Sequence, residues 1–588
     1  MRWLLIVLLI AGCGGEKLAD NNVLIIGIDG ADPRLMQHLM DSGKLPNFAK
    51  LAEAGHFSEL ATVNPPQSPV VWSAIATGSN PGETGVFDFI MRDAETYLPK
   101  LSISQQDRGG YINPVKAEPF WKAASDAGVP ATVIRWPLSF PAERINGRML
   151  SGLGVPDIQG FMNSYHFYAT EAASGEGAEK VILVELKDGM IETAVKGPFI
   201  KSGQVEAPLQ ITVKKDGAIL SLDKEYAVVL GGWSDWIRIR FAAGALKNVY
   251  GVAKVHLESV EPFRMYMTSV MIDPENPVVK LSYPEGYAGE LAQAIGMYYT
   301  LGMPEDTKAL EEGRISEEVF LQQVAEIEEE RRRMFWHEFE GFSGVYAFVF
   351  DASDRLMHTF WDEDLFSGGE VPAEIEDYFV GFDGFLGEVL ERIDDKTRLL
   401  IISDHGFTSF KRAVTINRWL VDNGYMVLKQ EPQDSGDLFK YVDWERTRAY
   451  SLGFSSIYVN LKGCEGKGIV EDREALVDEI VGNLKGLRDG NRSVITELYK
   501  REDIYSGKYL EDAPDIIIGF EPGYRMSWQN AVGGLTDEVI TNNNKKWAAD
   551  HIVDARHVPG VVFANFELKE NMTVMDIGPL ILELGGAD

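Results

Sequence analysis

The sequence predicts an α/β fold, with a mostly parallel central sheet flanked by helices and an antiparallel, β-rich insertion. Three short runs support the sheet, because "VLIIGID", "VYAFVFD" and "RLLIISD" each lead from continuous apolar residues into an acid. Such runs are typical of parallel strands that are buried on both faces. Between them lie segments with apolar residues at helical spacing, such as "DPRLMQHLMDSG" and "SEEVFLQQVAEIEEERRRMFWHEF". Alternating strands and helices favour a sheet that is covered by helices on both sides.

The middle of the chain has a different pattern. From about Lys180 to Ile272, stretches such as "LQITVKKDGAILSL" alternate every two residues and contain Asp-Gly turns, as antiparallel strands do. We therefore expect a β-rich insertion at residues 165–285 within a main domain formed by residues 13–164 and 286–588. The simplest function for this insertion is a lid or wall without chemistry of its own.

The N-terminus reads "MRWLLIVLLIAGCGG", in which Arg2 precedes an apolar run and small residues lead to Cys13. The run is too short to cross a bilayer and suits a secretory signal. It resembles a bacterial lipoprotein signal, in which residues 1–12 would be removed and lipid attached to Cys13. This implies an extracytoplasmic, membrane-anchored lipoprotein in the periplasm or at the cell surface. An ordinary signal peptide with an incidental cysteine is the alternative.

Charge and cysteine content limit the functions to consider. The 588 residues carry a formal net charge of −33 at pH 7, and such a surface repels nucleic acid and anionic membranes. We therefore expect no nucleic-acid partner. The second of the two cysteines, Cys464, would have no intramolecular partner once Cys13 carries lipid, so stability has to come from the core.

Polar residues gather at the predicted strand ends. Asp29 follows the first run, Asp404 and His405 follow the third, and Asp354 lies just beyond the second, with His358 four residues later. A spacing of four places two side chains on one face of a helical turn. Because ligands bind at the carboxyl ends of parallel strands, we expect these residues to share one site. Carboxylates and imidazoles without thiolates suit Zn²⁺, or Mn²⁺ and related ions.

A serine follows two prolines in "NPPQSPVVWSAIATGSNPGETG", at the expected start of a helix. This hydroxyl, on Ser68, would lie beside backbone N–H groups that can receive a phosphate oxygen. Taken alone, the residue is explained equally well as a helix cap. Beside a divalent cation its pKa would fall, and it would become a nucleophile.

The motifs "IGIDG", "QSPVVWSAIATGSNPGETG", "DRLMH" and "SDHGF", followed by a late histidine, occur in this order. The order is similar to that of the alkaline phosphatase superfamily, and most similar to its type I phosphodiesterase/nucleotide pyrophosphatase branch. The resemblance covers Val23 to about Asn565 apart from the β-rich insertion. It implies an alkaline phosphatase-like catalytic domain with two divalent metal ions, expected to be Zn²⁺, with Mn²⁺ as the alternative.

The resemblance also implies how the ligands are divided between the two ions. Asp354 and His358 would hold one ion together with the late histidine. The other ion would be held by Asp29, Asp404, His405 and Ser68, the last of which is also the catalytic nucleophile.

The late histidine has two candidates in "WAADHIVDARHVPGVVFAN", His551 and His557. We prefer His551, because "ADH" just ahead of "VPGVVFAN" resembles the pattern of a bacterial subgroup of the branch.

The function implied by the resemblance is metal-dependent hydrolysis of a small-molecule phosphate ester through a phosphoseryl intermediate, with diesters and monoesters both open. Related nucleotide pyrophosphatases carry Asn after the Asp of a "DNN" stretch, whereas here Phe89 follows Asp88, which argues against nucleotide substrates. In "SPVVW", Trp72 and the lack of a following Arg argue against a sulfatase. The alternative is a non-catalytic, tethered binding protein that retains the fold.

Overall fold

The computed structural model describes residues 22–587 except 108–109, 173–176, 245–247 and 362–368. Its central sheet consists of β1 (Asn22–Ile28), β2 (His56–Leu60), β7 (Ala131–Ile134), β8 (Gly147–Leu150), β20 (Ser282–Tyr283), β21 (Val345–Phe350), β22 (Thr397–Ile402) and β33 (Gly560–Ala564). The strand order is β2-β33-β22-β1-β21-β7-β8-β20. The strands from β22 to β8 are mutually parallel, and β33 and β20 run antiparallel to the strands beside them. The predicted α/β fold with a mostly parallel sheet is confirmed.

Alternation along β1 shows that both faces of the sheet are covered. Leu24, Ile26 and Ile28 pack into one hydrophobic core, whereas Val23 and Ile25 pack into another. Strands β21 and β22 divide their side chains between the same two cores. A strand between two cores has no solvent-facing side, which explains why its sequence is an unbroken apolar run.

Helices supply the other half of each core. One core contains α1 (Pro33–Asp41), α2 (Pro46–Ala54), α8 (Glu317–Phe339), α9 (Ala352–Phe360) and α10 (Ala373–Arg392), and the other contains α3 (Ser68–Thr77), α5 (Phe120–Asp126) and α15 (Ile577–Gly585). Helices α1 and α8, which the sequence predicts most clearly, each begin after a residue type that commonly caps helices. Asp32 accepts hydrogen bonds from the backbone of α1, and Ser316 accepts one from the backbone of α8.

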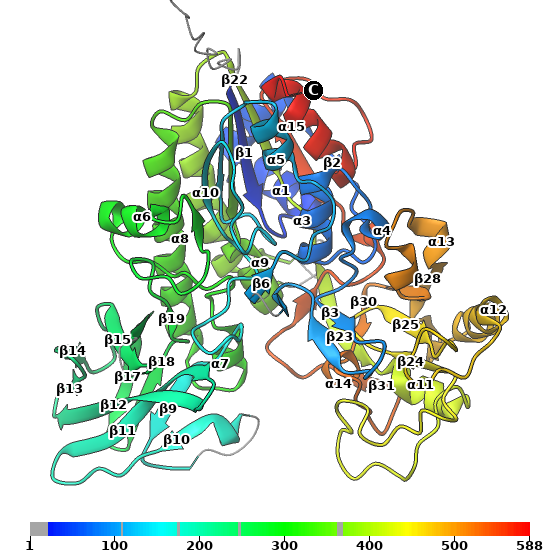
Figure 1. Cartoon of the computed structure of the whole chain (residues 1–588). Coiled ribbons are helices and arrows are strands. Elements are labelled where there is room, and N and C mark those ends of the chain that lie inside the picture. The colour runs from blue at the N-terminus through cyan, green and yellow to red at the C-terminus, as the bar shows by residue number, and fades with distance from the viewer. Residues whose placement is uncertain (1–21, 108–109, 173–176, 245–247, 362–368, 588) are drawn as a thin grey trace, which may run out of the picture.

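The β-rich segment follows β8 and precedes β20 in the chain, and Figure 1 shows its strands together at the lower left. Its strands include β9 (His166–Ala169), β10 (Val181–Leu183), β11 (Met190–Ile200), β12 (Gly203–Lys214), β13 (Gly217–Ser221), β14 (Glu225–Val229), β15 (Ile237–Ala242), β16 (Asn248–Ala253), β17 (Val255–Val260), β18 (Phe263–Met267) and β19 (Met271–Ile272). Their pairing is antiparallel except between β9 and β10. Asp188 and Gly189 have φ of 50° and 78°, as an Asp-Gly turn before β11 requires. The division of the chain at residues 164/165 and 285/286 stays a prediction.

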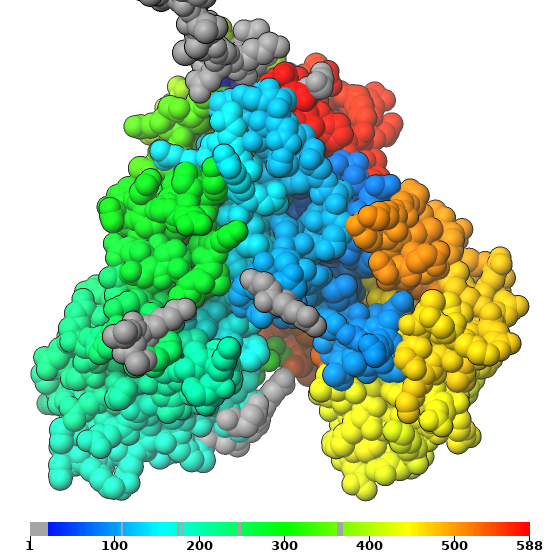
Figure 2. All heavy atoms as spheres, in the orientation of Figure 1, coloured from blue at the N-terminus to red at the C-terminus, as the bar shows by residue number. Residues whose placement is uncertain are grey.

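A second lobe follows β22. It contains β23 (Thr408–Val414), β24 (Ala449–Ser451), β25 (Ser456–Val459), β28 (Ile495–Lys500), β29 (Ile516–Phe520), β30 (Gly523–Met526), β31 (Ile540–Asn542) and β32 (Ala549–Asp550). This lobe has a hydrophobic core of its own, into which α11 (Ile416–Asp422) and α12 (Arg473–Leu484) also pack. In Figure 2 a cleft separates the β-rich segment, at the lower left, from the second lobe, at the lower right.

The predicted signal at residues 1–12 and the lipid-bearing Cys13 lie outside the described residues. Within the part of the chain that the structure describes, no helix combines the length and the hydropathy that a membrane span needs. Cys464 is a free, exposed thiol.

Substituting Gly27 tests how tightly β1 is packed against α3. A Cβ at Gly27 would lie 2.6 Å from Trp72 Cη2 and 2.9 Å from Val349 Cγ2. We expect Gly27→Ala to destabilise the fold by about 1–3 kcal/mol, because a filled core cannot accept another methyl group without shifts. The midpoint of thermal unfolding should fall.

Gly384→Ala is the matched control, because a Cβ on this exposed residue of α10 meets nothing within 4 Å. This variant should be about 0.5–1 kcal/mol more stable than the wild type, since glycine weakens a helix interior. An unchanged midpoint for Gly27→Ala would contradict the packing described.

Candidate metal centre

The candidate site lies where β1, β21 and β22 end. Asp29 follows β1, Asp404 and His405 follow β22, and α9, which begins after β21, carries Asp354 and His358. Parallel strands bring their carboxyl ends to one edge of the sheet, which explains why residues so distant in sequence meet there.

Two further predicted residues reach the same place from other elements. Ser68 is the first residue of α3, and His551 directly follows β32. The structure thus brings all seven predicted site residues together, and each of them is 4% exposed or less. The other candidate, His557, is only partly buried, and its Nε2 lies 3.0 Å from Thr496 Oγ1.

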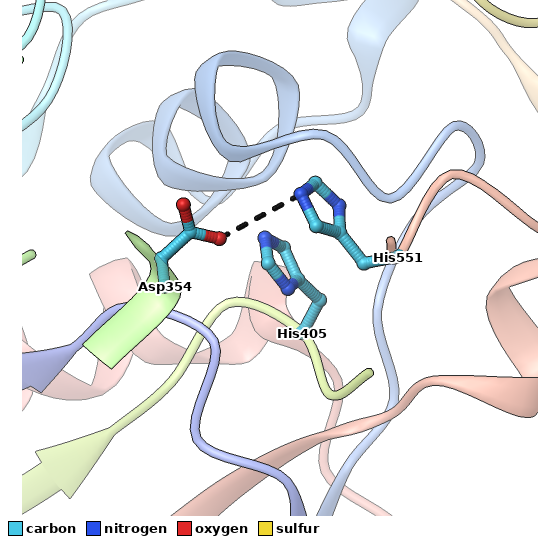
Figure 3. A group of neighbouring side chains, drawn as sticks. All are labelled: Asp354, His405 and His551. Carbon is cyan, nitrogen blue, oxygen red and sulfur yellow. Dashed lines mark ion pairs between the residues drawn. The ribbon is translucent and has the colours of Figure 1, made fainter. Parts of the chain in front are cut away.

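Two groups of potential ligand atoms are especially close. One comprises Asp29, Asp404 and His405, as the resemblance implied, and the other comprises Asp354, His405 and His551. Figure 3 shows the second group, in which the Asp354 carboxylate and the two imidazoles point toward one another. The resemblance placed His358 rather than His405 in this group. His358 Nε2 nevertheless lies 3.3 Å from Asp354 Oδ1, so the two groups form one continuous cluster.

The Ser68 hydroxyl lies between a carboxylate and an imidazole. Its Oγ donates a hydrogen bond to Asp29 Oδ1 at 3.3 Å and is also 3.3 Å from His405 Nε2. The second oxygen of Asp29 accepts a 2.9 Å hydrogen bond from Trp72 Nε1. Because Ser68 and Trp72 lie one turn apart on α3, this helix fixes both the hydroxyl and the carboxylate beside it.

The three histidines are oriented in the same way. In each of them Nδ1 faces a backbone carbonyl. The Nδ1 of His358 lies 2.8 Å from the Ala549 carbonyl, and that of His551 lies 2.5 Å from the Pro66 carbonyl. The Nδ1 of His405 lies 3.1 Å from the Gly406 carbonyl. A carbonyl oxygen can only accept, so each Nδ1 carries hydrogen. In the neutral rings the Nε2 lone pairs are therefore directed at the carboxylates.

These lone pairs face carboxylate oxygens that no other group satisfies. Among the described residues, Asp354 Oδ1 and Asp404 Oδ2 have no hydrogen-bond donor. Their nearest imidazole atoms are His358 Nε2 at 3.3 Å and His405 Nε2 at 3.1 Å. Lone pairs of nitrogen and oxygen repel at such distances unless a proton or a cation lies between them. The residues therefore fit divalent metal ions, with the nitrogen and oxygen ligands typical of Zn²⁺ and Mn²⁺.

Without a metal the site is electrostatically strained. Burial and then the charges of Asp404 and Asp354 raise the pKa of Asp29 well above its usual range. Burial lowers the pKa of His405, but the charges of Asp404 and Asp29 outweigh it and raise this pKa to about 9. Burial, followed by the charge of His405, holds the pKa of His551 well below its usual range. The metal-free His405 thus holds a proton at neutral pH that a metal ion would displace.

Several residues around the cluster were not identified from the sequence. Arg355 Nη1 pairs with Asp354 Oδ2 at 2.8 Å, and the Trp547 ring stacks on His358 at 3.6 Å. Asp550 lies 4.0 Å from His358 Nδ1 and accepts a 2.8 Å hydrogen bond from Trp547 Nε1. For Asp550 the sequence held one signal, because the pair Asp550-His551 repeats the pair Asp404-His405.

The "FDFI" stretch supports the segment that leads into α3. Asp88 accepts hydrogen bonds from Gln67 Nε2 at 2.9 Å and from the Phe454 backbone at 2.8 Å. The Phe89 backbone in turn donates to Gln67 Oε1 at 2.9 Å. Burial raises the pKa of Asp88 to about 6. Because Gln67 immediately precedes Ser68, this stretch fixes the position of the hydroxyl.

Comparisons with known proteins identify the family of the chain. The sequence matches the family model described as Type I phosphodiesterase / nucleotide pyrophosphatase over residues 23–199 and 268–539. A comparison with curated proteins gave no match.

Solved structures that are similar to this chain include phosphonoacetate hydrolase from Sinorhizobium meliloti 1021 in complex with phosphonoacetate. It shares 12% sequence identity at a TM-score of 0.48, with 97% of this chain and 96% of that chain covered. Murine ectonucleotide pyrophosphatase / phosphodiesterase 5 shares 12% identity at a TM-score of 0.42, with 96% and 95% covered.

The family match spans more than half of the chain. The protein therefore belongs to the type I phosphodiesterase/nucleotide pyrophosphatase family of the alkaline phosphatase superfamily, a family of metal-dependent hydrolases of phosphate esters.

Proposed function

We propose that the protein hydrolyses a small-molecule phosphate ester, with Ser68 as the nucleophile at a two-metal site. The observation that supports this most directly is the position of Ser68 Oγ, 3.3 Å from both Asp29 Oδ1 and His405 Nε2. A serine that only capped its helix would not need a buried carboxylate and imidazole beside it. Phosphodiesters and phosphomonoesters are both compatible with this arrangement.

The proposed ligands fall into two sets that meet at His405. Asp29, Asp404, His405 and Ser68 would hold one ion, and Asp354, His358 and His551 the other. When bound, Zn²⁺ or Mn²⁺ would lower the pKa of the serine hydroxyl and offset the negative charge of the phosphoryl group. Three carboxylates that are otherwise close enough to repel support this assignment.

The chain's own groups then account for the reaction. Asp29 orients the Ser68 hydroxyl as its hydrogen-bond acceptor, and Oγ attacks phosphorus while the bond to the ester oxygen breaks and the alcohol leaves with a proton. Ser68 stands at the N-terminus of α3, where the helix dipole favours a phosphate oxygen. Water then attacks the phosphoseryl group, and the phosphate leaves while Oγ regains a proton. Two displacements predict retention of configuration at phosphorus.

Location follows from the N-terminal sequence alone. We propose that the mature chain is tethered outside the cytoplasm, in the periplasm or at the cell surface, through lipid on Cys13. The small apolar run and the residues around the cysteine support this proposal.

Removing the proposed nucleophile tests the reaction. Ser68→Ala should lower turnover of p-nitrophenyl phosphate and bis-p-nitrophenyl phosphate by roughly 10³-fold or more, while bound metal, measured by mass spectrometry, is retained. Ser73→Ala is the matched control, because this buried serine of the same helix bonds to the Pro69 carbonyl within α3. It should keep its activity.

The same assay separates the enzyme from a tethered binding protein. If the metal-loaded wild type turns over neither ester, and added chelator changes nothing, the result would favour the non-catalytic alternative. A Ser68→Ala variant with wild-type turnover would remove the serine from the mechanism.

Proton release on metal loading is a second prediction. At pH 7.5 the metal-free His405 should carry an extra proton, since its pKa is raised to about 9. A metal ion needs the Nε2 lone pair, so loading should release at least about one proton per chain. Release should diminish as the pH rises through 9. Calorimetric titrations with Zn²⁺ in buffers of different ionisation enthalpy measure this number.

Two histidine variants serve as comparisons for the proton count. His405→Gln should release fewer protons, and His557→Gln should release as many as the wild type, because His557 lies outside the cluster. Metal loading at pH 7.5 without proton release would show that the charges around His405 differ from those described.

A further inference from the structure

A cavity of about 300 Å³ adjoins the metal centre and lies between the two lobes. Its walls include Asn163, Met303 and Glu305 from the side of the β-rich segment, and Trp528 and Trp547 from the second lobe. The volume is at the lower end of the range for ligand pockets, so the cavity suits a small group such as a single ring.

Two residues of this cavity also contact proposed metal ligands. Arg355 lines it and pairs with Asp354 at 2.8 Å. Trp547 lines it and stacks on His358 at 3.6 Å. A group bound in the cavity would therefore lie next to a phosphoryl group held at the metal centre.

The polar atoms of the cavity wall are incompletely satisfied. Among the described residues, both carboxylate oxygens of Glu305, Asn163 Oδ1 and Trp528 Nε1 are buried without a hydrogen-bond partner on another residue. Glu305 is only 2% exposed. Unpaired buried polar groups are costly, so these positions indicate a ligand that supplies the missing bonds. It must offer several donors and at least one acceptor.

The cations of the wall already have anionic partners. Arg355 pairs with Asp354, Lys545 pairs with Glu311, and Lys308 Nζ lies 3.8 Å from Glu312 Oε1. Glu312 Oε1 is shared with Lys180 Nζ at 2.7 Å, but the unpaired carboxylate of Glu305 offsets the remaining charge of Lys308, so the wall offers no excess of positive charge for a second phosphate or carboxylate. The ligand that fits is therefore uncharged.

The two tryptophans do not form a slot for a flat base. Their rings meet at 81°, with centroids 5.8 Å apart. One face of each tryptophan ring is already covered. Trp547 stacks on His358, and the Arg525 guanidinium lies 4.0 Å from the Trp528 centroid. A saturated ring needs only apolar contact with such surfaces, which Met303 also provides.

We propose that this cavity binds the alcohol part of the substrate, and that this alcohol is a polyhydroxylated ring, either a sugar or a cyclitol. Each hydroxyl of such a ring can donate to Glu305 or Asn163 and accept from Trp528 Nε1, while its C–H faces contact the tryptophans. The proposal rests on the proposed hydrolase function and names the substrate class of that same site.

The test compares two esters that differ in their hydroxyls but share a six-membered ring and a secondary alcohol. The probes are myo-inositol 1-phosphate and cyclohexyl phosphate, with the methyl diester of each. For the metal-loaded chain we expect kcat/KM to favour the inositol ester by at least about 10-fold, because a site with buried polar groups rejects an analogue that leaves them unpaired.

The Glu305 carboxylate is the group to alter. Glu305→Gln replaces one acceptor by a donor at nearly constant shape and should lower the inositol-to-cyclohexyl ratio by about 10-fold. Glu311→Gln is the matched control, because Glu311 lines the same cavity but is paired with Lys545. It should leave the ratio unchanged.

A binding measurement without catalysis completes the test. Saturation-transfer NMR on the metal-free chain should detect myo-inositol but not cyclohexanol, and Glu305→Gln should weaken the inositol signal.

The outcomes separate the two proposals. Turnover of p-nitrophenyl esters with an inositol-to-cyclohexyl ratio of one or less would overturn the substrate class and leave the hydrolase function intact. Equal NMR signals from inositol and cyclohexanol would overturn it as well. No turnover of any ester by the metal-loaded chain would overturn the hydrolase function and, with it, the assignment of this cavity to a substrate alcohol.

Discussion

The structure depends on one electrostatic constraint: carboxylate oxygens and imidazole nitrogens direct their lone pairs at one another in a buried site. Asp354 Oδ1 and Asp404 Oδ2 lie 3.3 Å and 3.1 Å from the Nε2 atoms of His358 and His405. Such an arrangement is stable only when positive charge lies between the groups. The fold holds it rigidly, because Trp72 and the Gly30 backbone bond the second oxygens of Asp29 and Asp404.

The scaffold divides its tasks between regions. The parallel sheet brings three strand ends to one edge, α3 supplies Ser68, and the second lobe supplies His551 together with the Trp547 ring that packs on His358. The described residues of the β-rich segment contribute no ligand to the cluster, but the chain that follows the segment supplies Glu305 to the wall of the neighbouring cavity. Most of the cavity wall lies outside the ligand cluster and can vary without changing a ligand, whereas Arg355 and Trp547 contact both.

Much of the fold and the site was predictable from short sequence patterns. A strand buried on both faces must be continuously apolar, so β1, β21 and β22 were evident, and the acids at their ends followed from the geometry of a parallel sheet. The second lobe was not predicted, since strands such as Ala449–Ser451 are too short to show a period. Arg355, Trp547 and Glu305 were missed because their roles depend on contacts between distant segments. The shared position of His405 in both ligand groups also required coordinates, because sequence order cannot show which of two imidazoles lies nearer to Asp354.

The proposed two-metal site can be tested by anomalous X-ray diffraction from a crystal of the Zn²⁺-loaded protein, measured on both sides of the zinc absorption edge. We expect two anomalous peaks within the cluster, one beside Asp29 and Asp404 and one beside Asp354 and His551, with His405 between them. Peaks confined to the protein surface, or a cluster that contains water and no metal in the loaded crystal, would contradict it.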